Sequence, residues 1–235
     1  MIDGLQVVKF SLRDFWEDFV LLAAFNLLWS ATAFLPLVPL VFLPNVSAIW
    51  RLVASILLVV PLPIVSGALC FVTNQISHGK AVNWRMFSTG VRQYWGKSLV
   101  VALANVVVLI LLVTNVQFYA FIVQGTWTNI VLSLWVVAAL YWLLVQVLWF
   151  PMILELESEK VLLALRNALV MAIITPAFSI TLAVAILILS VLSVVLTVPL
   201  VLFWASLVLL IMNHATRSRL AYALKKPYQP GMEEG

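Results

Sequence analysis

Four long stretches without a charged side chain constrain the fold of this chain more than any other feature of its sequence. They cover 19–50, 52–79, 98–154 and 167–216. An α-helix needs roughly 20 mostly apolar residues to cross the hydrocarbon core of a bilayer. Each of the first two stretches therefore holds one span, and the third must fold back once. The fourth is long enough for two spans, with a single span as the alternative.

Composition supports a membrane protein and excludes soluble classes. Hydrophobic residues make up 65% of the 235 residues and charged residues 9%, whereas soluble domains carry about 25% charged residues. The apolar stretches are continuous, which favours helices over the alternating strands of a barrel. We predict an all-α, polytopic membrane helix bundle of about six transmembrane helices with cytoplasmic in-plane amphipathic helices. It forms one integral membrane domain, 1–235, with spans at approximately 19–43, 52–76, 98–122, 129–153, 174–195 and 199–216, and 217–235 as a cytoplasmic tail.

The distribution of basic residues predicts the orientation. Loops on the cytoplasmic side of a membrane are enriched in Lys and Arg. With a cytoplasmic N-terminus, twelve of the thirteen bases lie inside and only Arg51 lies outside. Both termini are therefore expected to be cytoplasmic. The net charge of +4 is explained by attraction to anionic lipid, and no nucleic-acid partner is expected.

Three segments between the spans are predicted to be amphipathic helices lying along the membrane surface. Ser11 and Asp14 are interpreted as a capping box that opens the first. In the second, aromatic residues repeat at helical spacing opposite bases, and in the third a stripe of leucines lies opposite Lys160 and Arg166. The simpler interpretation is that these helices anchor the bundle at the interface. The alternative is a docking surface for a cytoplasmic protein, formed by Trp84, Arg85, Phe87, Arg92, Trp95 and Arg166.

The predicted spans contain no Asp, Glu, Lys or Arg. Since such groups mark proton relays and ion sites, their absence argues against a pump or a proton-coupled transporter. His78 and His214 fall at the predicted cytoplasmic ends, where we expect solvated interface residues. We expect no catalytic, cofactor-binding or metal-binding residues.

Uncharged polar residues and helix-breaking residues within the spans are candidates for contacts between helices or for the lining of a transport pathway. A polar side chain in hydrocarbon seeks a partner on a neighbouring helix, and unwound helices line the binding sites of transporters. The alternative interpretation of Pro61 and Pro63 is that one of them lies at the beginning of a helix and does not interrupt a span. The candidate contact or break residues are Asn26, Pro61, Pro63, Gly67, Asn105 and Gln146.

Several short motifs resemble those of the YesL-like proteins, a family of small bacterial multi-span membrane proteins with a domain of unknown function. They are Phe25-Asn26-Leu27-Leu28-Trp29, then Leu62-Pro63-Ile64-Val65-Ser66-Gly67-Ala68, the stretch 87–95, and Arg166-Asn167-Ala168-Leu169. Ser66 stands where that family usually has Thr, and 36–60 is longer than its connection. The resemblance implies a bacterial cell membrane and a link to carbohydrate uptake.

The sequence thus favours a non-enzymatic accessory or structural subunit of a larger membrane assembly. Its expected partners are the lipid bilayer and either another membrane protein or further copies of the chain. The alternative is a small transporter or channel component with an uncharged pathway near Pro61–Gly67. A membrane-embedded enzyme ranks last, because no acid–base pair stands out in the sequence.

Overall fold

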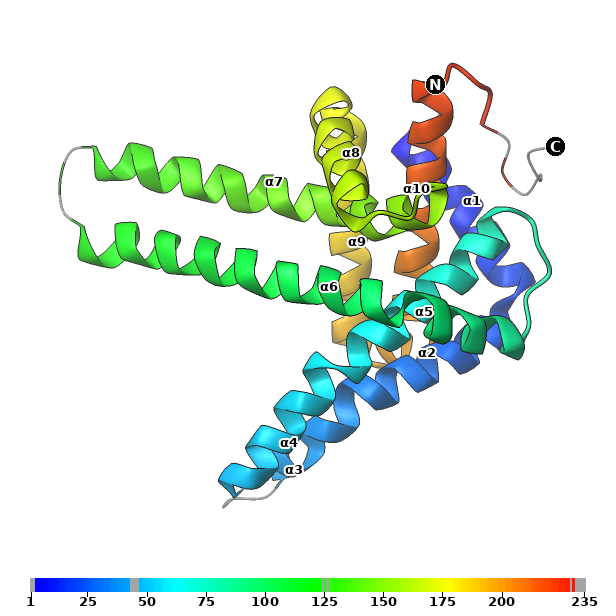
Figure 1. Ribbon diagram of the computed structural model, residues 1–235, viewed down its shortest axis with the longest axis horizontal. Helices are drawn as coiled ribbons and strands as arrows, with labels where there is room; N and C mark the ends of the chain where they lie inside the picture. The colour runs from blue at the N-terminus through cyan, green and yellow to red at the C-terminus, as the bar shows by residue number, and fades with distance from the viewer. Residues whose placement is uncertain (1–2, 43–46, 124, 126, 229, 231–235) are drawn as a thin grey trace.

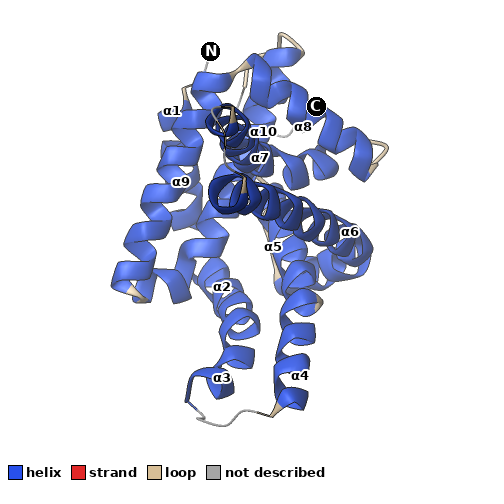
Figure 2. Ribbon diagram, turned by 90° about the vertical axis from the view of Figure 1, so that its left-hand side faces the viewer, coloured by secondary structure: helices blue, strands red, loops and turns tan. Residues whose placement is uncertain are grey.

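The structure, a computed structural model, describes residues 3–42, 47–123, 125, 127–228 and 230. These residues form helices joined by short turns, and no strand occurs among them (Figures 1 and 2). The α-helices are α1 (Gly4–Glu17), α2 (Phe19–Phe34), α3 (Val38–Phe42), α4 (Ala48–Val59), α5 (Pro61–Ser77), α6 (Trp84–Gln117), α7 (Thr128–Glu155), α8 (Val161–Ile174), α9 (Pro176–Leu196) and α10 (Ala205–Ala223). A 3-10 turn, η1 (Leu35–Leu37), and two π-helical segments, η2 (Phe118–Ile122) and η3 (Leu200–Trp204), extend some of them.

Six helical segments of the described chain are long and apolar enough to cross a membrane, which confirms the predicted fold class. They are Phe19–Leu40, Ala48–Ser77, Trp84–Ile122, Thr128–Glu155, Pro176–Leu196 and Leu200–Ala223. The stretch 167–216 therefore holds two spans rather than one. They meet at Thr197, whose positive φ of 59° ends α9.

The structure corrects three boundaries. α6 is one helix of 34 residues, about 51 Å long at 1.5 Å per residue, so the segment at 84–97 continues directly into the span instead of forming a separate in-plane helix. No proline interrupts it. α10 runs to Ala223, so the predicted tail from 217 begins inside a helix. α1 begins at Gly4, and the backbone N–H of Asp3 donates to the Gln6 side chain; Ser11 and Asp14 therefore do not cap it.

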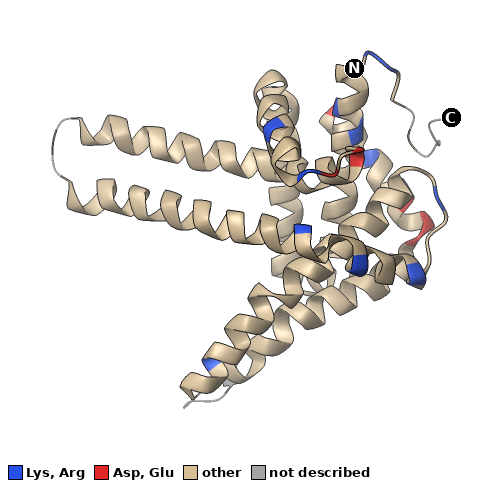
Figure 3. Cartoon of the chain, in the orientation of Figure 1, with Lys and Arg blue, Asp and Glu red and all other residues tan. Residues whose placement is uncertain are grey.

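Two helical hairpins diverge from a common base. In Figure 1, α6 and α7 run side by side toward the left, while α2–α3 and α4–α5 run toward the lower left. Figure 2 views the first hairpin nearly end-on and the second from the side, so the two hairpins extend in different directions in both views. The two termini lie at the base. Most charged residues also gather there, and most of the α6–α7 hairpin carries none (Figure 3).

Proline and glycine shape the region around α5. Pro61 is the first residue of α5, a position where the missing N–H costs no hydrogen bond. The break between α4 and α5 therefore falls at Val60, directly before Pro61, and Pro63 lies in the first turn of α5. Gly67 lies where α5 crosses α6: a Cβ atom there would approach Ser98 Oγ to 1.9 Å. Only a residue without a side chain allows this approach.

Candidate functional site: a buried polar cluster

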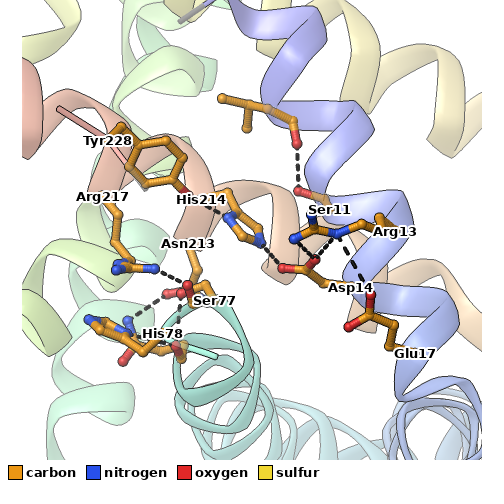
Figure 4. A network of polar contacts seen from close by, with 12 residues as sticks. Ser11, Arg13, Asp14, Glu17, Ser77, His78, Asn213, His214, Arg217 and Tyr228 are labelled. Carbon is orange, nitrogen blue, oxygen red and sulfur yellow. Dashed lines mark hydrogen bonds and ion pairs between the residues drawn. The ribbon is translucent and has the colours of Figure 1, made fainter. Parts of the chain in front are cut away.

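A group of polar side chains is buried at the base of the bundle, where α1, α5, α7, α10 and the C-terminal segment meet (Figure 4). We call it the polar cluster. Its members are Asp14, Thr73, Asn74, Ser77, His78, Glu155, Asn213, His214, Arg217 and Tyr228.

The first half of the polar cluster joins the two ends of the chain. Asp14 of α1 is 4% exposed, and its Oδ2 lies 3.0 Å from Nε2 of His214, which is fully buried on α10. The other ring nitrogen, Nδ1, contacts the hydroxyl of Tyr228. A neutral imidazole has one N–H, so the arrangement fits a ring proton on Nε2 facing the carboxylate, with Nδ1 accepting from Tyr228. Arg13 donates two hydrogen bonds to Asp14 Oδ1, at 2.9 and 2.8 Å.

The second half joins α10 to α5 and α7. The Arg217 guanidinium donates to the carbonyl of Ser77 at the end of α5. Asn213, one turn earlier, donates to the Cys70 carbonyl at 3.1 Å and to Thr73 Oγ1 at 2.9 Å. Asn74 connects the two sides, because its amide nitrogen lies 3.2 Å from Asn213 Oδ1 and 2.6 Å from Glu155 Oε1. His78 Nε2 lies 3.6 Å from the same carboxylate.

Burial and hydrogen bonding set the pKa values at the rim of the cluster. Burial alone would raise the pKa of Asp14, but the neighbouring His214 and Arg13 lower it below its ordinary value. Burial raises the pKa of the Tyr228 hydroxyl to about 12. Asp14 is therefore a carboxylate and Tyr228 a neutral phenol at physiological pH. Because these groups contact one another, the arrangement is suited to fastening helices together.

Asn26 makes the other extensive set of polar contacts between helices. Its side-chain nitrogen donates to the Val201 carbonyl at 2.7 Å and to the Leu200 carbonyl at 3.2 Å, both on η3. Its oxygen accepts from the backbone N–H of Ser206 at 3.0 Å. The π-helical segment exposes carbonyl groups that an α-helical ladder would use, and Asn26 supplies their donor.

Four of the six contact or break residues line one cavity of about 330 Å³ between α5, α6, α7 and α10: Pro63, Gly67, Asn105 and Gln146. Pro61 and Asn26 do not line it. Asn105 accepts a hydrogen bond from the Trp142 indole at 3.2 Å. The amide nitrogen of Gln146 is buried and has no hydrogen-bond partner in the described part of the chain.

Five of the six residues considered for a docking surface are exposed, and one is buried. Trp84, Arg85, Arg92 and Trp95 are exposed on α6, and Arg166 is exposed on α8. Phe87 is a correction to the prediction: it is 9% exposed, and its ring stacks on Phe25 of α2 at 4.8 Å. It belongs to the core, because Phe25 of α2 covers its ring.

The prediction of solvated histidines is wrong for His214, and the polar cluster was missed. A signal was present in the helical spacing. Asn213, His214 and Arg217 lie at positions i, i+1 and i+4, and Asn74, Ser77 and His78 at i, i+3 and i+4, so each set shares one helix face. Two polar faces on neighbouring helices indicate a polar contact between them.

The fold and the polar cluster define the class of protein, which is a polytopic all-α membrane protein. In it, α1 and the segment after α10 both contact α10 through His214. Comparison of the chain with protein families, with curated proteins and with solved structures finds no match.

Proposed function

We propose that this chain is a non-enzymatic accessory or structural subunit of a larger membrane assembly. The supporting observation is the α6–α7 hairpin, which extends away from the other spans (Figure 1). Only 11% of the residues in the most apolar window of each of its two helices are buried, against 61% for the span that contains α10. One hairpin thus offers two nearly complete helix faces to a neighbouring transmembrane chain.

The ends of the hairpin support a membrane-crossing position. Trp95 lies in the first half of α6, and Tyr119 lies in η2, which follows α6, with its ring centroid 6.1 Å from that of Trp127. The rise over the 24 residue steps from Trp95 to Tyr119 is about 36 Å of helix. This length fits a hydrocarbon core of about 30 Å with an aromatic residue at each interface.

The chemistry of the polar cluster supports a structural role over a catalytic one. His214 contacts Asp14 with one ring nitrogen and Tyr228 with the other, and it is fully buried. A bacterial cell membrane and a connection to carbohydrate uptake are proposed on the resemblance to YesL-like proteins alone, with the cluster and both termini on the cytoplasmic side.

Site-specific photo-crosslinking in the membranes of the source cell tests the subunit proposal. A photoreactive residue replaces Leu103 or Ile110 on α6, which are 65% and 61% exposed, or Leu52 on α4, which is 63% exposed and serves as the matched control. We expect covalent protein adducts from the α6 positions and far fewer from Leu52. Lipid adducts alone from all three positions would contradict the proposal, and adducts between copies of the chain would identify a homo-oligomer.

The second candidate is a pathway for a small uncharged polar solute, and the cavity containing Gln146 favours it. Its buried amide nitrogen can donate to a solute oxygen, and no acidic or basic residue lines the cavity in the described part of the chain. Flux of glycerol or a neutral sugar into vesicles containing the purified chain would support this function if Gln146→Leu abolishes it. Asn115→Leu is the control, because Asn115 bonds only to its own helix, at Leu111. Equal flux in empty vesicles would exclude it.

A further inference from the structure

The cavity between α5, α6, α7 and α10 has both polar and apolar walls. Asn105 of α6 and Gln146 of α7 line it together with apolar side chains such as Phe150, Leu209 and Met212, and its volume is about 330 Å³. Ligand sites in proteins usually measure about 300–1,000 Å³ and combine apolar walls with a few polar groups. The cavity therefore has the size and the composition of a small ligand site.

A neighbouring indole fixes the orientation of the Asn105 amide. The Trp142 indole N–H donates to Asn105 Oδ1 at 3.2 Å, and because an indole can only donate, the amide oxygen must face it. The amide nitrogen Nδ2 therefore remains available for another contact. Trp142 and Gln146 lie at positions i and i+4 of α7 and share one face of that helix, so the two amides lie on the same side of the cavity.

The two amides present hydrogen-bond donors that no acceptor in the described chain satisfies. Gln146 Nε2 is buried and has no hydrogen-bond partner among the described residues, and Asn105 Nδ2 donates to none of them either. The two lining serines, Ser66 and Ser98, already donate to carbonyls of their own helices at 2.8 and 2.9 Å. Because buried donors without an acceptor are costly and rare, we expect the acceptor to come from a molecule bound in the cavity.

Water alone does not suit this cavity. Its volume equals that of roughly eleven liquid water molecules at about 30 Å³ each, and a buried water needs two to four polar partners. Two amides on otherwise mostly apolar walls cannot supply partners for that many waters. A larger molecule that is apolar over most of its surface and has an oxygen acceptor at one edge matches both kinds of wall.

The depth and the charge of the cavity narrow the class of ligand. Asn105 lies about 15 Å along α6 from Trp95, whereas Tyr119 lies about 36 Å from Trp95, so the cavity is at the depth of the hydrocarbon core. No acidic or basic residue lines it in the described part of the chain, so it offers no counter-charge to a carboxylate, a phosphate or an amine. An uncharged molecule dissolved in the bilayer fits both conditions.

From these observations we propose that the cavity binds the carbonyl group of an uncharged, membrane-soluble molecule. A carbonyl oxygen has two lone pairs and can accept one hydrogen bond from each amide nitrogen, while the rest of the molecule contacts Phe150, Leu209 and Met212. The inference rests on the second candidate function, because it assigns a class of ligand to the same cavity. It requires binding alone, however, and not transport.

Fluorine NMR with a matched pair of probes tests the proposal on the full chain in phosphatidylcholine vesicles. The first probe, para-fluoroacetophenone, is an uncharged ketone, and the second, para-fluoroethylbenzene, has a similar shape but no oxygen. Exchange with the protein broadens the fluorine signal of a bound probe beyond its width in empty vesicles. We expect this excess broadening for the ketone and much less for the hydrocarbon. The ketone should bind about five-fold more weakly to Gln146→Leu, from the loss of one hydrogen bond.

Two controls separate loss of binding from loss of folding. Asn115→Leu removes an amide that bonds only to its own helix and does not line the cavity, so it should leave ketone binding unchanged. Gln146→Leu removes a buried donor without a partner in the described chain, so its melting temperature in the absence of the probe should be unchanged or higher. A lower melting temperature would show that Gln146 makes a structural contact, and it would overturn the proposal.

The other outcomes also decide between the inference and the second candidate function. Equal broadening of the two probes, no broadening beyond that in empty vesicles, or unchanged ketone binding to Gln146→Leu would each overturn the inference. Ketone binding without flux of glycerol would support the inference and count against the second candidate function. Flux of glycerol without ketone binding would do the reverse.

Discussion

The contact between Asp14 and His214 should be one of the strongest single determinants of stability in this molecule. Removing the carboxylate with Asp14→Ala takes away the oxygen that lies 3.0 Å from the buried Nε2 of His214, and leaving that buried polar group without its neighbour costs about 1–3 kcal/mol. The hydrogen bonds to Arg13 add no more than about 1 kcal/mol, because the Arg13 side chain is 52% exposed. The expected loss in the free energy of unfolding is therefore about 1–4 kcal/mol. Asp14→Asn keeps an acceptor and should lose about half as much.

Reversible unfolding in mixed detergent micelles measures these losses, and two comparisons make the test specific. Glu17→Ala also removes a carboxylate near Arg13, at 3.7 Å, but Glu17 is 69% exposed, so its loss should stay below about 0.5 kcal/mol. A double-mutant cycle of Asp14→Ala with His214→Ala should give a coupling energy above about 1 kcal/mol. A loss no larger than that of Glu17→Ala, or a coupling near zero, would refute the reasoning.

The pH dependence gives an independent check on the same carboxylate. The pKa of Asp14 is lowered in the folded protein, so its contribution to stability is present above the unfolded pKa of about 4 and is lost as pH falls through the lower folded pKa. The difference in stability between the wild type and Asp14→Asn should therefore shrink below about pH 4 and stay constant between pH 5 and 8. A difference that grows on acidification would contradict the assignment.

Three further predictions concern other contacts. Gly67→Ala should destabilise the chain by about 1–3 kcal/mol through overpacking against α6, whereas Gly96→Ala, with no atom within 4 Å of the new Cβ, should be neutral or stabilising in thermal unfolding. The folded pKa of Tyr228, about 12, exceeds the ordinary value of about 10, so its contribution to stability is complete below pH 10 and is lost as pH rises toward 12; in alkaline titrations Tyr228→Phe should show a smaller decline over this interval. Asn26→Ala leaves the Ser206 N–H and the η3 carbonyls without a partner and should cost about 1–3 kcal/mol in detergent unfolding; a loss below 0.5 kcal/mol would contradict this.

The spans could be predicted from the sequence because each depends on a local property. A continuous apolar stretch identifies a helix regardless of its neighbours, and the break between α4 and α5 directly before Pro61 follows from the covalent structure of proline. The contacts could not be predicted in this way. Asp14 and His214 are 200 positions apart, so their pairing depends on how α1 packs against α10. Phe87 shows the same limit: an aromatic residue on an amphipathic helix suits the membrane interface, until Phe25 of another helix covers it.

The helices around the polar cluster are held together by polar contacts, whereas most of the α6–α7 hairpin is exposed. We therefore expect stability to depend on the first region and partner binding on the second. In the core, α10 carries His214 and Arg217 because α1, α5 and the C-terminal segment satisfy them; without those neighbours, such groups in an apolar span would be costly. The outer part of the α6–α7 hairpin carries few such groups, and two of them, Asn115 and Ser133, donate to carbonyls of their own helices. A partner bound to the hairpin would therefore leave the polar cluster unchanged. It follows that substitutions in the cluster should lower stability without changing crosslinking at Ile110, and bulky substitutions along α6 should abolish crosslinking without lowering stability.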